Sequence, residues 1–374
     1  MSPYRVGIIG FAHMHVNHVA EVFGQHPKVD VVACADTVPL NPELRAAPYT
    51  RQWNKDHMVE LLSIPAVYDS YAEMLAKEKL DLAIITCENA QHPDVVEACA
   101  QAGVHVCVEK PMAMSMADAL RMSRAVRAAG TKMLVNWPLS SSAAARLAKN
   151  LIDEGRIGRV LQVRWRSGHT GPLGVGVTHQ GVTDKGGALS GPEKGATWWH
   201  QTAAGGGALL DYCCYGCMVS RWYVGEQAQS AYGMQANLDS QWGDASDNGA
   251  MIVRFPSAYA LMAGSWTTLD HGIPTGPIVY GSEGTLVVEQ RDGQEVVRLA
   301  YGGGKEEVLT PEPLQPGERD IAEAYIAYLD EDVTPHISLQ PTFNLECMAI
   351  LDAGVRSATS GQQEVVSGDA WTIG

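Results

Sequence analysis

Short apolar runs alternate with amphipathic stretches over the first 136 residues of the chain. Buried strands are predicted at 5–10, 29–35, 80–86, 104–108 and 131–136. Helical patterns lie between them, at 16–23, at 70–77, after Pro93 and at 116–129, whereas 40–66 is predicted to be irregular or weakly helical. Strands that alternate with helices indicate a parallel sheet with right-handed crossovers. The first 136 residues are therefore expected to form a doubly wound α/β domain.

The pattern changes after residue 136. A helix is predicted at 140–154, a strand at 159–167, a long glycine-rich loop at 168–197 and a helix at 210–224. Strands then recur near 229–237, 249–255, 258–268, 276–281, 284–290 and 295–300, and two helices follow near 318–330 and 340–359. Short strands separated by Gly, Pro, Ser and Asp indicate antiparallel pairing. Residues 137–374 are thus expected to form an α+β domain with a large open, mostly antiparallel sheet.

Composition mainly excludes classes of partner. The chain has 374 residues, 46% of them hydrophobic, and a formal net charge of −15. This charge, without a basic patch, argues against nucleic acid or an anionic membrane as a partner. No apolar run is as long as a membrane span, and the first residues lack a signal-peptide pattern, so we expect a cytoplasmic protein.

The eight cysteines lie mostly inside apolar segments, as expected of reduced thiols in a cytoplasm. Cys214 and Cys217 form one CxxC pair. A structural zinc site needs four ligands, and no second pair lies at a suitable spacing. No metal site is therefore predicted.

The first predicted strand leads into Gly10-Phe11-Ala12-His13-Met14-His15. A dinucleotide fingerprint, G-x-G-x-x-G, would stand at this place. Ala12 replaces its second glycine and is still small enough to let the backbone approach a pyrophosphate, whereas His15 replaces the third. The order of strand, loop and helix at the start of the chain favours a dinucleotide-binding Rossmann domain.

Asp36 ends the second strand, 26 residues after Gly10. An acid near this position accepts the ribose hydroxyls of NAD and repels the 2′-phosphate of NADP. No arginine follows within the next few residues, so NAD is favoured over NADP. The alternative is an acid that only caps the end of the strand.

The strand at 104–108 delivers a charged pair, Glu109-Lys110, followed by Pro111. Proline restricts the residue before it to extended backbone, so Lys110 is expected at the tip of the strand. Ligands of open α/β sheets bind at the carboxyl ends of strands. Lys110 is therefore a candidate for chemistry, and the alternative is a surface ion pair.

A second informative stretch runs from Gly205 to Tyr215. Three glycines allow a tight turn before a helix, and Asp211 and Tyr215 stand four residues apart, on one helical face. A carboxylate beside a phenol can bind and deprotonate a substrate hydroxyl. The alternative is an amphipathic helix with an acid in its first turn and a packed tyrosine.

Together, Glu109-Lys110-Pro111 and Gly205-Gly-Gly-x-Leu-x-Asp211-x-x-x-Tyr215 resemble the Gfo/Idh/MocA family, which includes glucose–fructose oxidoreductase, inositol dehydrogenase and dimeric dihydrodiol dehydrogenase. The resemblance covers nearly the whole chain. Its further segments are 67–75, 155–159, 264–266, 280–284 and 357–361. The loop Cys87-Glu88-Asn89 departs from the family's common Thr-Pro-Asn form.

The resemblance implies that Lys110, Asp211 and Tyr215 are the catalytic residues, with Tyr215 in place of an acid–base histidine. We expect the Lys110 ammonium to lower the pKa of Tyr215, and Asp211 to hold a substrate hydroxyl. The implied cofactor-binding residues are Gly10, Ala12, Met14, His15, Asp36, Thr86, Asn89, His92, Glu109, Lys110 and Asn136.

The expected function is hydride transfer between NAD(P) and a secondary alcohol of a sugar, glycoside or cyclitol, with NADP the less favoured cofactor. Candidate substrate residues are Arg166, His169, Trp199 and His200. The resemblance implies a homodimer or homotetramer, paired through the exposed side of the large sheet. Two alternatives are a redox-assisted glycosidase with tightly held NAD and a non-catalytic NAD-binding sugar sensor.

Overall fold

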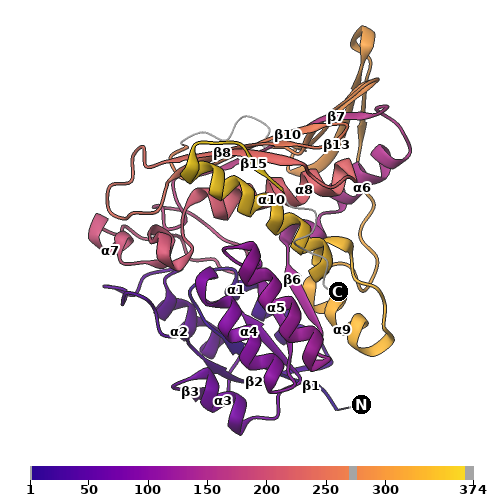
Figure 1. Ribbon diagram of the computed structural model, residues 1–374. Helices are drawn as coiled ribbons and strands as arrows, with labels where there is room; N and C mark the ends of the chain where they lie inside the picture. Colours follow the sequence, from indigo (N-terminus) through magenta and orange to yellow (C-terminus); the bar gives the residue numbers. More distant parts are fainter. Residues whose placement is uncertain (1, 269–275, 367–374) are drawn as a thin grey trace.

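The computed structural model describes residues 2–268 and 276–366, which form two sheets with helices between and around them (Figure 1). The first sheet has six strands in the order β3-β2-β1-β4-β5-β6, and every pair is parallel. The strands are β1 (Tyr4–Ile9), β2 (Val29–Ala35), β3 (Ala66–Tyr68), β4 (Leu82–Ile85), β5 (His105–Glu109) and β6 (Met133–Asn136). The predicted doubly wound parallel sheet is confirmed.

Five helices alternate with these strands: α1 (Val16–Gln25), α2 (Arg51–Leu61), α3 (Tyr71–Lys77), α4 (His92–Gln101) and α5 (Met116–Ala129). Local signals set their ends, since the side chain of Ser115 caps α5 and Gly130 ends it in the left-handed conformation. The prediction for 40–66 was too weak, because α2 is a regular helix of 11 residues and β3 begins at Ala66. Low amphipathicity hid α2, whose apolar side chains are few.

The second sheet has nine strands in the order β14-β13-β12-β11-β7-β10-β9-β8-β15. All its pairs are antiparallel except β7 with β10. The strands are β7 (Val160–Gly168), β8 (Ser230–Ala236), β9 (Asn248–Arg254), β10 (Tyr259–Ser265), β11 (Ile278–Gly281), β12 (Gly284–Arg291), β13 (Gln294–Tyr301), β14 (Glu306–Leu309) and β15 (Glu364–Val365). The mostly antiparallel sheet is confirmed, with β14 and β15 as additional short edge strands.

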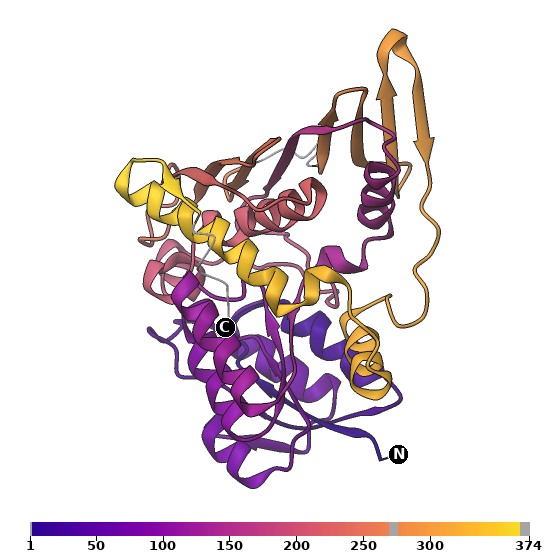
Figure 2. The same ribbon diagram turned by 45° about the vertical axis from the view of Figure 1, so that its right-hand side comes forward.

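Helices cover one face of this larger sheet. α6 (Ala143–Asp153), α8 (Cys214–Val224) and α10 (Pro341–Ser360) pack between it and the first half of the chain, as Figure 2 shows. On the other face, Tyr232, Met234, Ile252 and Tyr259 are exposed apolar side chains of β8, β9 and β10. No helix within 2–268 or 276–366 packs against that face.

The chain crosses back to the first sheet near its end. Helix α9 (Ile321–Glu331) packs against α1, and the Tyr325 hydroxyl lies within hydrogen-bonding distance of the carbonyl oxygens of Val106 (2.9 Å) and Lys132 (2.8 Å). Tyr325 is fully buried in the main core, which includes residues of both halves. This return connects the second half of the chain to the first sheet.

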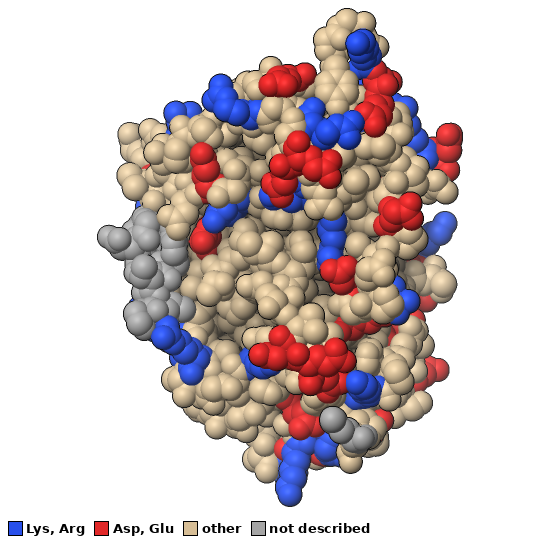
Figure 3. Space-filling model, turned by 90° about the vertical axis from the view of Figure 1, so that its right-hand side faces the viewer, with Lys and Arg blue, Asp and Glu red and all other residues tan. Residues whose placement is uncertain are grey.

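The surface carries both signs of charge. Figure 3 shows acidic and basic side chains interspersed on one side of the molecule, around a central area without charged groups. None of the helices in the described ranges combines the length and the hydrophobicity that crossing a bilayer requires.

Candidate active site

The carboxyl ends of the parallel strands gather the residues predicted to hold a dinucleotide. Gly10 follows β1, Asp36 follows β2, Thr86 follows β4, and Glu109 and Asn136 end β5 and β6. The strand order reverses between β1 and β4, and open α/β sheets bind ligands at such a switch point. The remaining predicted cofactor residues lie in the segments that leave the same edge, with His92 as the first residue of α4: Ala12, Met14, His15, Asn89, His92 and Lys110.

The loop after β1 lies close against the loop after β4. Gly10 has φ +85°, and a Cβ added there would lie 2.5 Å from Cys87 Cβ, so a larger residue would be excluded. Thr86 Oγ1 donates to Gly10 O at 2.6 Å, and His13 N donates to Thr86 O at 3.0 Å. Gly10, the one fingerprint glycine that the chain retains, is therefore the residue that the close approach of these two loops requires.

The available polar atoms fit a dinucleotide. Asp36 Oδ1 accepts hydrogen bonds from Phe11 N (3.2 Å), Thr37 N (2.8 Å) and Arg51 Nη1 (2.6 Å). Its Oδ2 has no partner among the described residues and is left for a ribose hydroxyl. Asn89 Oδ1 is a buried acceptor that has no hydrogen-bond partner within residues 2–268 and 276–366. Such an atom requires a ligand or a water in the functional state.

A tryptophan pair from the second half covers the loop after β1. Trp198 Nε1 donates to Ala12 O at 2.7 Å, and both Trp198 and Trp199 are buried. The His13 ring lies 4.8 Å from the Trp199 ring, edge to face. Trp199 therefore lies beside the predicted dinucleotide loop.

Lys110 and Asp211 form a buried ion pair between the two halves. Lys110 Nζ lies 2.8 Å from Asp211 Oδ1 and 3.2 Å from Asp211 O, and the two side chains are 2% and 12% exposed. Asp211 Oδ2 accepts from Trp266 Nε1 at 3.2 Å. Burial alone would lower the pKa of Lys110, but the carboxylate of Asp211 raises it well above the ordinary value. Lys110 is therefore a charged donor at neutral pH.

Asp211 is ionised because the charge of Lys110 stabilises its carboxylate. Burial would raise the pKa of Asp211, but the Lys110 ammonium and its hydrogen bond bring that pKa below the ordinary value. The carboxylate thus already has two donors, and its expected role with a substrate hydroxyl adds a third.

Tyr215 lies against Lys110, but its pKa moves in the direction opposite to the prediction. Lys110 Nζ lies 4.9 Å from the centre of the Tyr215 ring, and the ring stacks on Trp165 at 5.7 Å. Burial raises the pKa of Tyr215, and the lowering effect of the Lys110 ammonium does not offset it. The prediction of a lowered pKa was wrong, because the sequence showed the charge but not the loss of solvent.

The predicted helix at 210–224 is confirmed, with an irregular start. Leu209–Cys213 forms a π-helical turn that carries Asp211, and α8 continues from Cys214. The turn follows Gly205 (φ +87°) and Gly207 (φ +109°). Such wide turns recur at functional sites. Here the turn presents Asp211 to Lys110 and Tyr215 to the same cavity.

Two histidines of the loop after β1 lie beside Glu109. His15 Nδ1 lies 2.8 Å from Glu109 Oε1, and Asn136 Nδ2 donates to Glu109 Oε2 at 2.8 Å. His13, His15 and Glu109 each bring one potential ligand atom to within 4.8 Å of the others. Both carboxylate oxygens already accept hydrogen bonds, so we interpret the cluster as a hydrogen-bonded network. His15 thus replaces the third glycine and also orients Glu109.

The cleft between the halves contains a cavity of about 610 Å³. Its lining brings together all three predicted catalytic residues and two of the predicted substrate residues: Lys110, Asp211, Tyr215, His169 and Trp199. A neighbouring cavity of about 570 Å³ shares His15, His179 and Tyr215 with it and also contacts Asn136. The two spaces meet at Tyr215.

The other two predicted substrate residues lie elsewhere. Side chains alternate along β7, and Arg166 projects on the opposite face from Ser167, where Nη2 donates to Thr268 Oγ1 at 2.8 Å. His200 is buried against Trp242 and Trp266 and does not line either cavity of the cleft. Strand parity and ring packing, which the sequence did not reveal, separate both residues from the site.

Sequence reasoning missed several residues of this region. Ser167, Thr170, Thr178 and His179 line the larger cavity, and they come from β7 and the glycine-rich loop after it. That loop has no hydrophobic period, so no residue in it could be assigned a direction. Burial lowers the pKa of His179 to about 4, which keeps its imidazole neutral.

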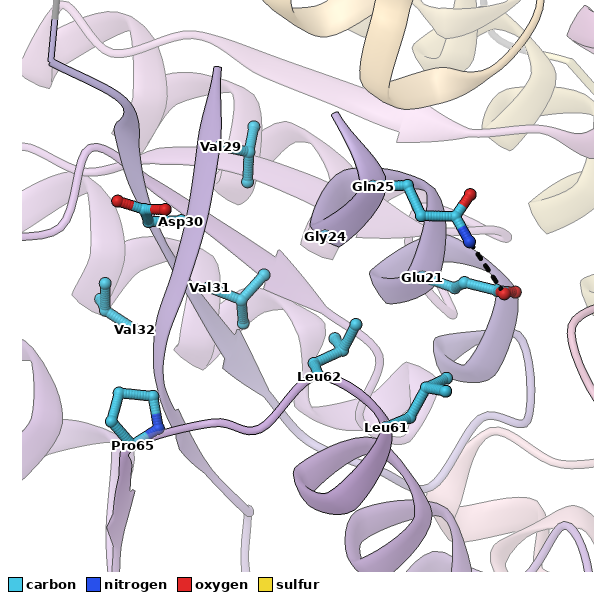
Figure 4. Close-up of a pocket in the computed structure, with 10 residues that line it drawn as sticks. All are labelled: Glu21, Gly24, Gln25, Val29, Asp30, Val31, Val32, Leu61, Leu62 and Pro65. Carbon is cyan, nitrogen blue, oxygen red and sulfur yellow. Dashed lines mark hydrogen bonds between the residues drawn. The ribbon is translucent and has the colours of Figure 1, made fainter. Parts of the chain in front are cut away.

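A separate hollow of about 490 Å³ lies at the opposite end of the first sheet, between α1, β2 and α2 (Figure 4). Its lining combines aliphatic side chains such as Val29 and Leu62 with polar ones such as Asp30, and Gln25 donates a hydrogen bond to Glu21 at one side. Val29 begins β2, so the hollow lies at the amino ends of the strands and away from the cleft.

Comparisons with known proteins agree with this geometry. Residues 4–137 match an oxidoreductase family model described as an NAD-binding Rossmann fold, and residues 145–287 match the Gfo/Idh/MocA C-terminal domain. The chain is 29% identical over 220 residues to a 1,5-anhydro-D-fructose reductase of Ensifer adhaerens, covering 58% of this chain and 60% of that protein. It is 28% identical over 163 residues to an inositol 2-dehydrogenase of Salmonella typhimurium, covering 43% and 45%.

The chain therefore spans about half the length of these curated relatives. Among solved structures, the WlbA dehydrogenase of Bordetella pertussis, in complex with NADH and UDP-GlcNAcA, superposes with a TM-score of 0.74 over 98% of this chain and 100% of that one, at 22% identity. This likeness shows the fold. With both family models placed on the two sheets described above, the chain belongs to the Gfo/Idh/MocA family of oxidoreductases.

Proposed function

We propose that this protein is an NAD-dependent oxidoreductase that acts on a secondary alcohol of a sugar, glycoside or cyclitol, or on the matching ketone. The observation that carries the proposal is the buried contact of Lys110 with Asp211 and Tyr215 beside the cavity. In this proposal residues 1–136 hold the dinucleotide, and residues 137–374 supply the substrate site and the contacts between subunits. The two relatives named above are a reductase and a dehydrogenase, which supports this class.

Asp36 and the loop after β1 would hold the adenosine end of NAD, and Glu109 and Asn136 would lie beside its nicotinamide end. NAD supplies the acceptor or donor of the hydride. Lys110 has three N–H groups, of which two point to Asp211 atoms. The third is available for the substrate oxygen, where negative charge develops during the reaction. Because the ammonium is already buried and oriented, it needs no reorganisation at that moment.

Tyr215 would transfer the proton. Its raised pKa keeps the phenol protonated at neutral pH, so Tyr215 is set to donate a proton to a carbonyl oxygen that is being reduced. In the oxidation direction it must first become a phenolate. The nearby Lys110 ammonium favours that form, and Asp211 and Glu109 oppose it. We therefore propose that reduction is the faster direction at neutral pH.

The cavity walls suit a polyhydroxylated ligand. His169, Thr170, Thr178 and His179 offer hydrogen-bonding groups, and Trp199 offers an aromatic surface. Aromatic rings pack against apolar faces, while the polar groups fix the hydroxyls. Arg166 and His200 are not part of this proposal, because neither lines the cavities of the cleft.

The exposed apolar face of the larger sheet supports a homo-oligomer. Tyr232, Met234 and Ile252 are 46%, 60% and 50% exposed, and register pairs Tyr232 with Ile252 across β8 and β9. Contiguous exposed apolar side chains mark interaction sites. We propose that two copies pair through this face. All eight cysteines are unpaired and buried, which supports a reducing compartment such as the cytoplasm.

A panel of aldoses, glycosides and cyclitols with NAD and NADP, and of the matching ketones with NADH and NADPH, followed at the absorbance of the reduced dinucleotide, tests the function. We expect turnover of at least one alcohol by the wild type, and strong loss of that turnover in Tyr215→Phe. No turnover with any member in either direction would contradict the proposed class of substrate.

A further inference from the structure

An arginine contacts the acid that would hold the adenosine ribose. Arg51 begins α2, and its side chain is 9% exposed. Nη1 lies 2.6 Å from Asp36 Oδ1 and donates to Thr37 O at 3.1 Å. Arginine at this place in a Rossmann fold accommodates the 2′-phosphate of NADP. No arginine stands in the few residues after Asp36, but Arg51 reaches it from α2, so Asp36 alone does not define the preference for NAD.

A second carboxylate holds the other side of the same guanidinium. Glu88, in the loop after β4, is 1% exposed, and its Oε1 accepts a hydrogen bond from Arg51 Nη2. Its Oε2 accepts from Thr37 Oγ1 at 3.3 Å. The side chains of Asp36, Glu88 and Arg51 together carry a charge of −1. With Asp36 on one nitrogen and Glu88 on the other, the fork of Arg51 is occupied on both arms.

We propose that Glu88 is a specificity-determining residue for the dinucleotide. It acts as a positioning residue: it holds Arg51 against Asp36, so that the guanidinium is not available to bind a 2′-phosphate. The site then accepts a 2′-hydroxyl and rejects a 2′-phosphate, both by charge and by the lack of a free donor. This inference rests on the proposed use of NAD(P) and adds the residue that selects between its two forms.

The alternative to this proposal is that Glu88 and Arg51 only stabilise the loops. Breaking a buried pair then changes the stability of the protein but not its choice between NAD and NADP. The ratio of the two dissociation constants therefore separates the explanations, because a structural role would weaken both nucleotides alike.

The test is isothermal titration of NAD and of NADP into the full-length protein. In Glu88→Gln the local charge changes from −1 to 0, and we expect NADP to bind about tenfold tighter while NAD changes by less than about threefold. Asp36→Ser alone leaves Arg51 hydrogen-bonded to Glu88, so its increase in affinity for NADP should be smaller than that of the double variant. In Asp36→Ser/Glu88→Gln the guanidinium of Arg51 is released from both carboxylates and keeps its contact with Thr37, and NADP should bind tighter than NAD.

Glu88→Pro provides a second way to remove the carboxylate if Glu88→Gln does not fold. Glu88 has φ −62° and ψ 145°, which proline adopts without strain. It should shift the NADP to NAD ratio in the same direction as Glu88→Gln. Circular dichroism of each variant shows whether the comparison is made on folded protein.

Glu43→Gln is the matched control. The Glu43 carboxylate accepts from the backbone N–H of Arg51, at 2.9 and 3.1 Å, and not from its guanidinium. Glu43→Gln removes a negative charge near Arg51 without releasing its guanidinium, so the NADP to NAD ratio should change less than in Glu88→Gln. Adding Arg51→Met to Asp36→Ser/Glu88→Gln should abolish the gain for NADP. An unchanged ratio in folded Glu88→Gln and Glu88→Pro, or a gain that survives Arg51→Met, would overturn the proposal. Failure of the wild type to bind either nucleotide would instead overturn the proposed function itself, and this inference with it.

Discussion

Removing Lys110 should destabilise the protein as well as inactivate it. In Lys110→Met the carboxylate of Asp211 stays buried and, among the residues that the structure describes, keeps the Trp266 Nε1 donor at 3.2 Å as its one side-chain donor. Breaking one side of a buried pair costs about 3–5 kcal/mol, because the other charge is left uncompensated. The remaining hydrogen bond places our expectation at the lower end, about 3 kcal/mol.

Thermal unfolding followed by circular dichroism measures this loss. At about 2–4 °C per kcal/mol for a unit of 150–250 residues, Lys110→Met should melt roughly 6–12 °C below the wild type. Lys77→Met is the matched control, because Lys77 pairs with Glu73 on the surface of α3 with 61% of its side chain exposed, and should change Tm by no more than about 2 °C. In Lys110→Met/Asp211→Leu both charges are gone, so the loss should be smaller than the sum of the single losses.

Acidification should reduce the difference in melting temperature between Lys110→Met and the wild type. Without the ammonium, burial raises the pKa of Asp211, so the folded variant binds a proton that the unfolded chain releases, and stability rises as the pH falls through the raised pKa. In the wild type, burial is outweighed by Lys110 and the pKa of Asp211 is lowered. The contribution of the pair is then present above the unfolded pKa and is lost as the pH falls through the folded pKa. A variant that melts with the wild type, or a gap that widens on acidification, would refute the reasoning.

Two further predictions concern the proton donor and the sheet face. Tyr215→Phe should keep the melting temperature of the wild type and lose about 10²–10⁴ in kcat. The rate of oxidation by the wild type should rise by about tenfold per pH unit from neutral pH upward, because burial raises the pKa of Tyr215 and the phenolate fraction grows with pH. Steady-state kinetics on a substrate of the wild type checks both, and a plateau of the oxidation rate near neutral pH would count against Tyr215 as the base. Tyr232→Lys/Met234→Lys should shift the protein to monomers in analytical ultracentrifugation, whereas Leu61→Lys, an exposed apolar residue of α2, should not; a double variant with the mass of the wild type would contradict pairing through this face.

The sequence was sufficient for the layout of the dinucleotide half. Each strand of the first sheet is a short apolar run bounded by turns, and parallel strands put their carboxyl ends at one edge, so the sequence alone places Gly10, Asp36 and Lys110 together. The Lys110–Asp211 contact could be expected from the family resemblance, since the two residues lie on different halves of the chain.

What the sequence could not show depends on tertiary register and burial. Arg51 reaches Asp36 because the irregular segment 37–50 folds back, and no periodic signal fixes that path. Arg166 lies on the outer face because of the register of β7 with β10, which a lone strand pattern leaves open. The raised pKa of Tyr215 follows from loss of solvent, which only the packed structure shows.

The most direct test of the account is transfer of a deuterium label. A polyol or sugar that the wild type oxidises is prepared with deuterium on the carbon of the reacting secondary alcohol, and the reduced dinucleotide is analysed by mass spectrometry. The account predicts that the label appears in NADH one for one with product, and that Tyr215→Phe forms labelled NADH far more slowly while still binding NAD. Product formed without label in the dinucleotide would contradict the central claim that this cleft moves a hydride between a carbohydrate alcohol and NAD.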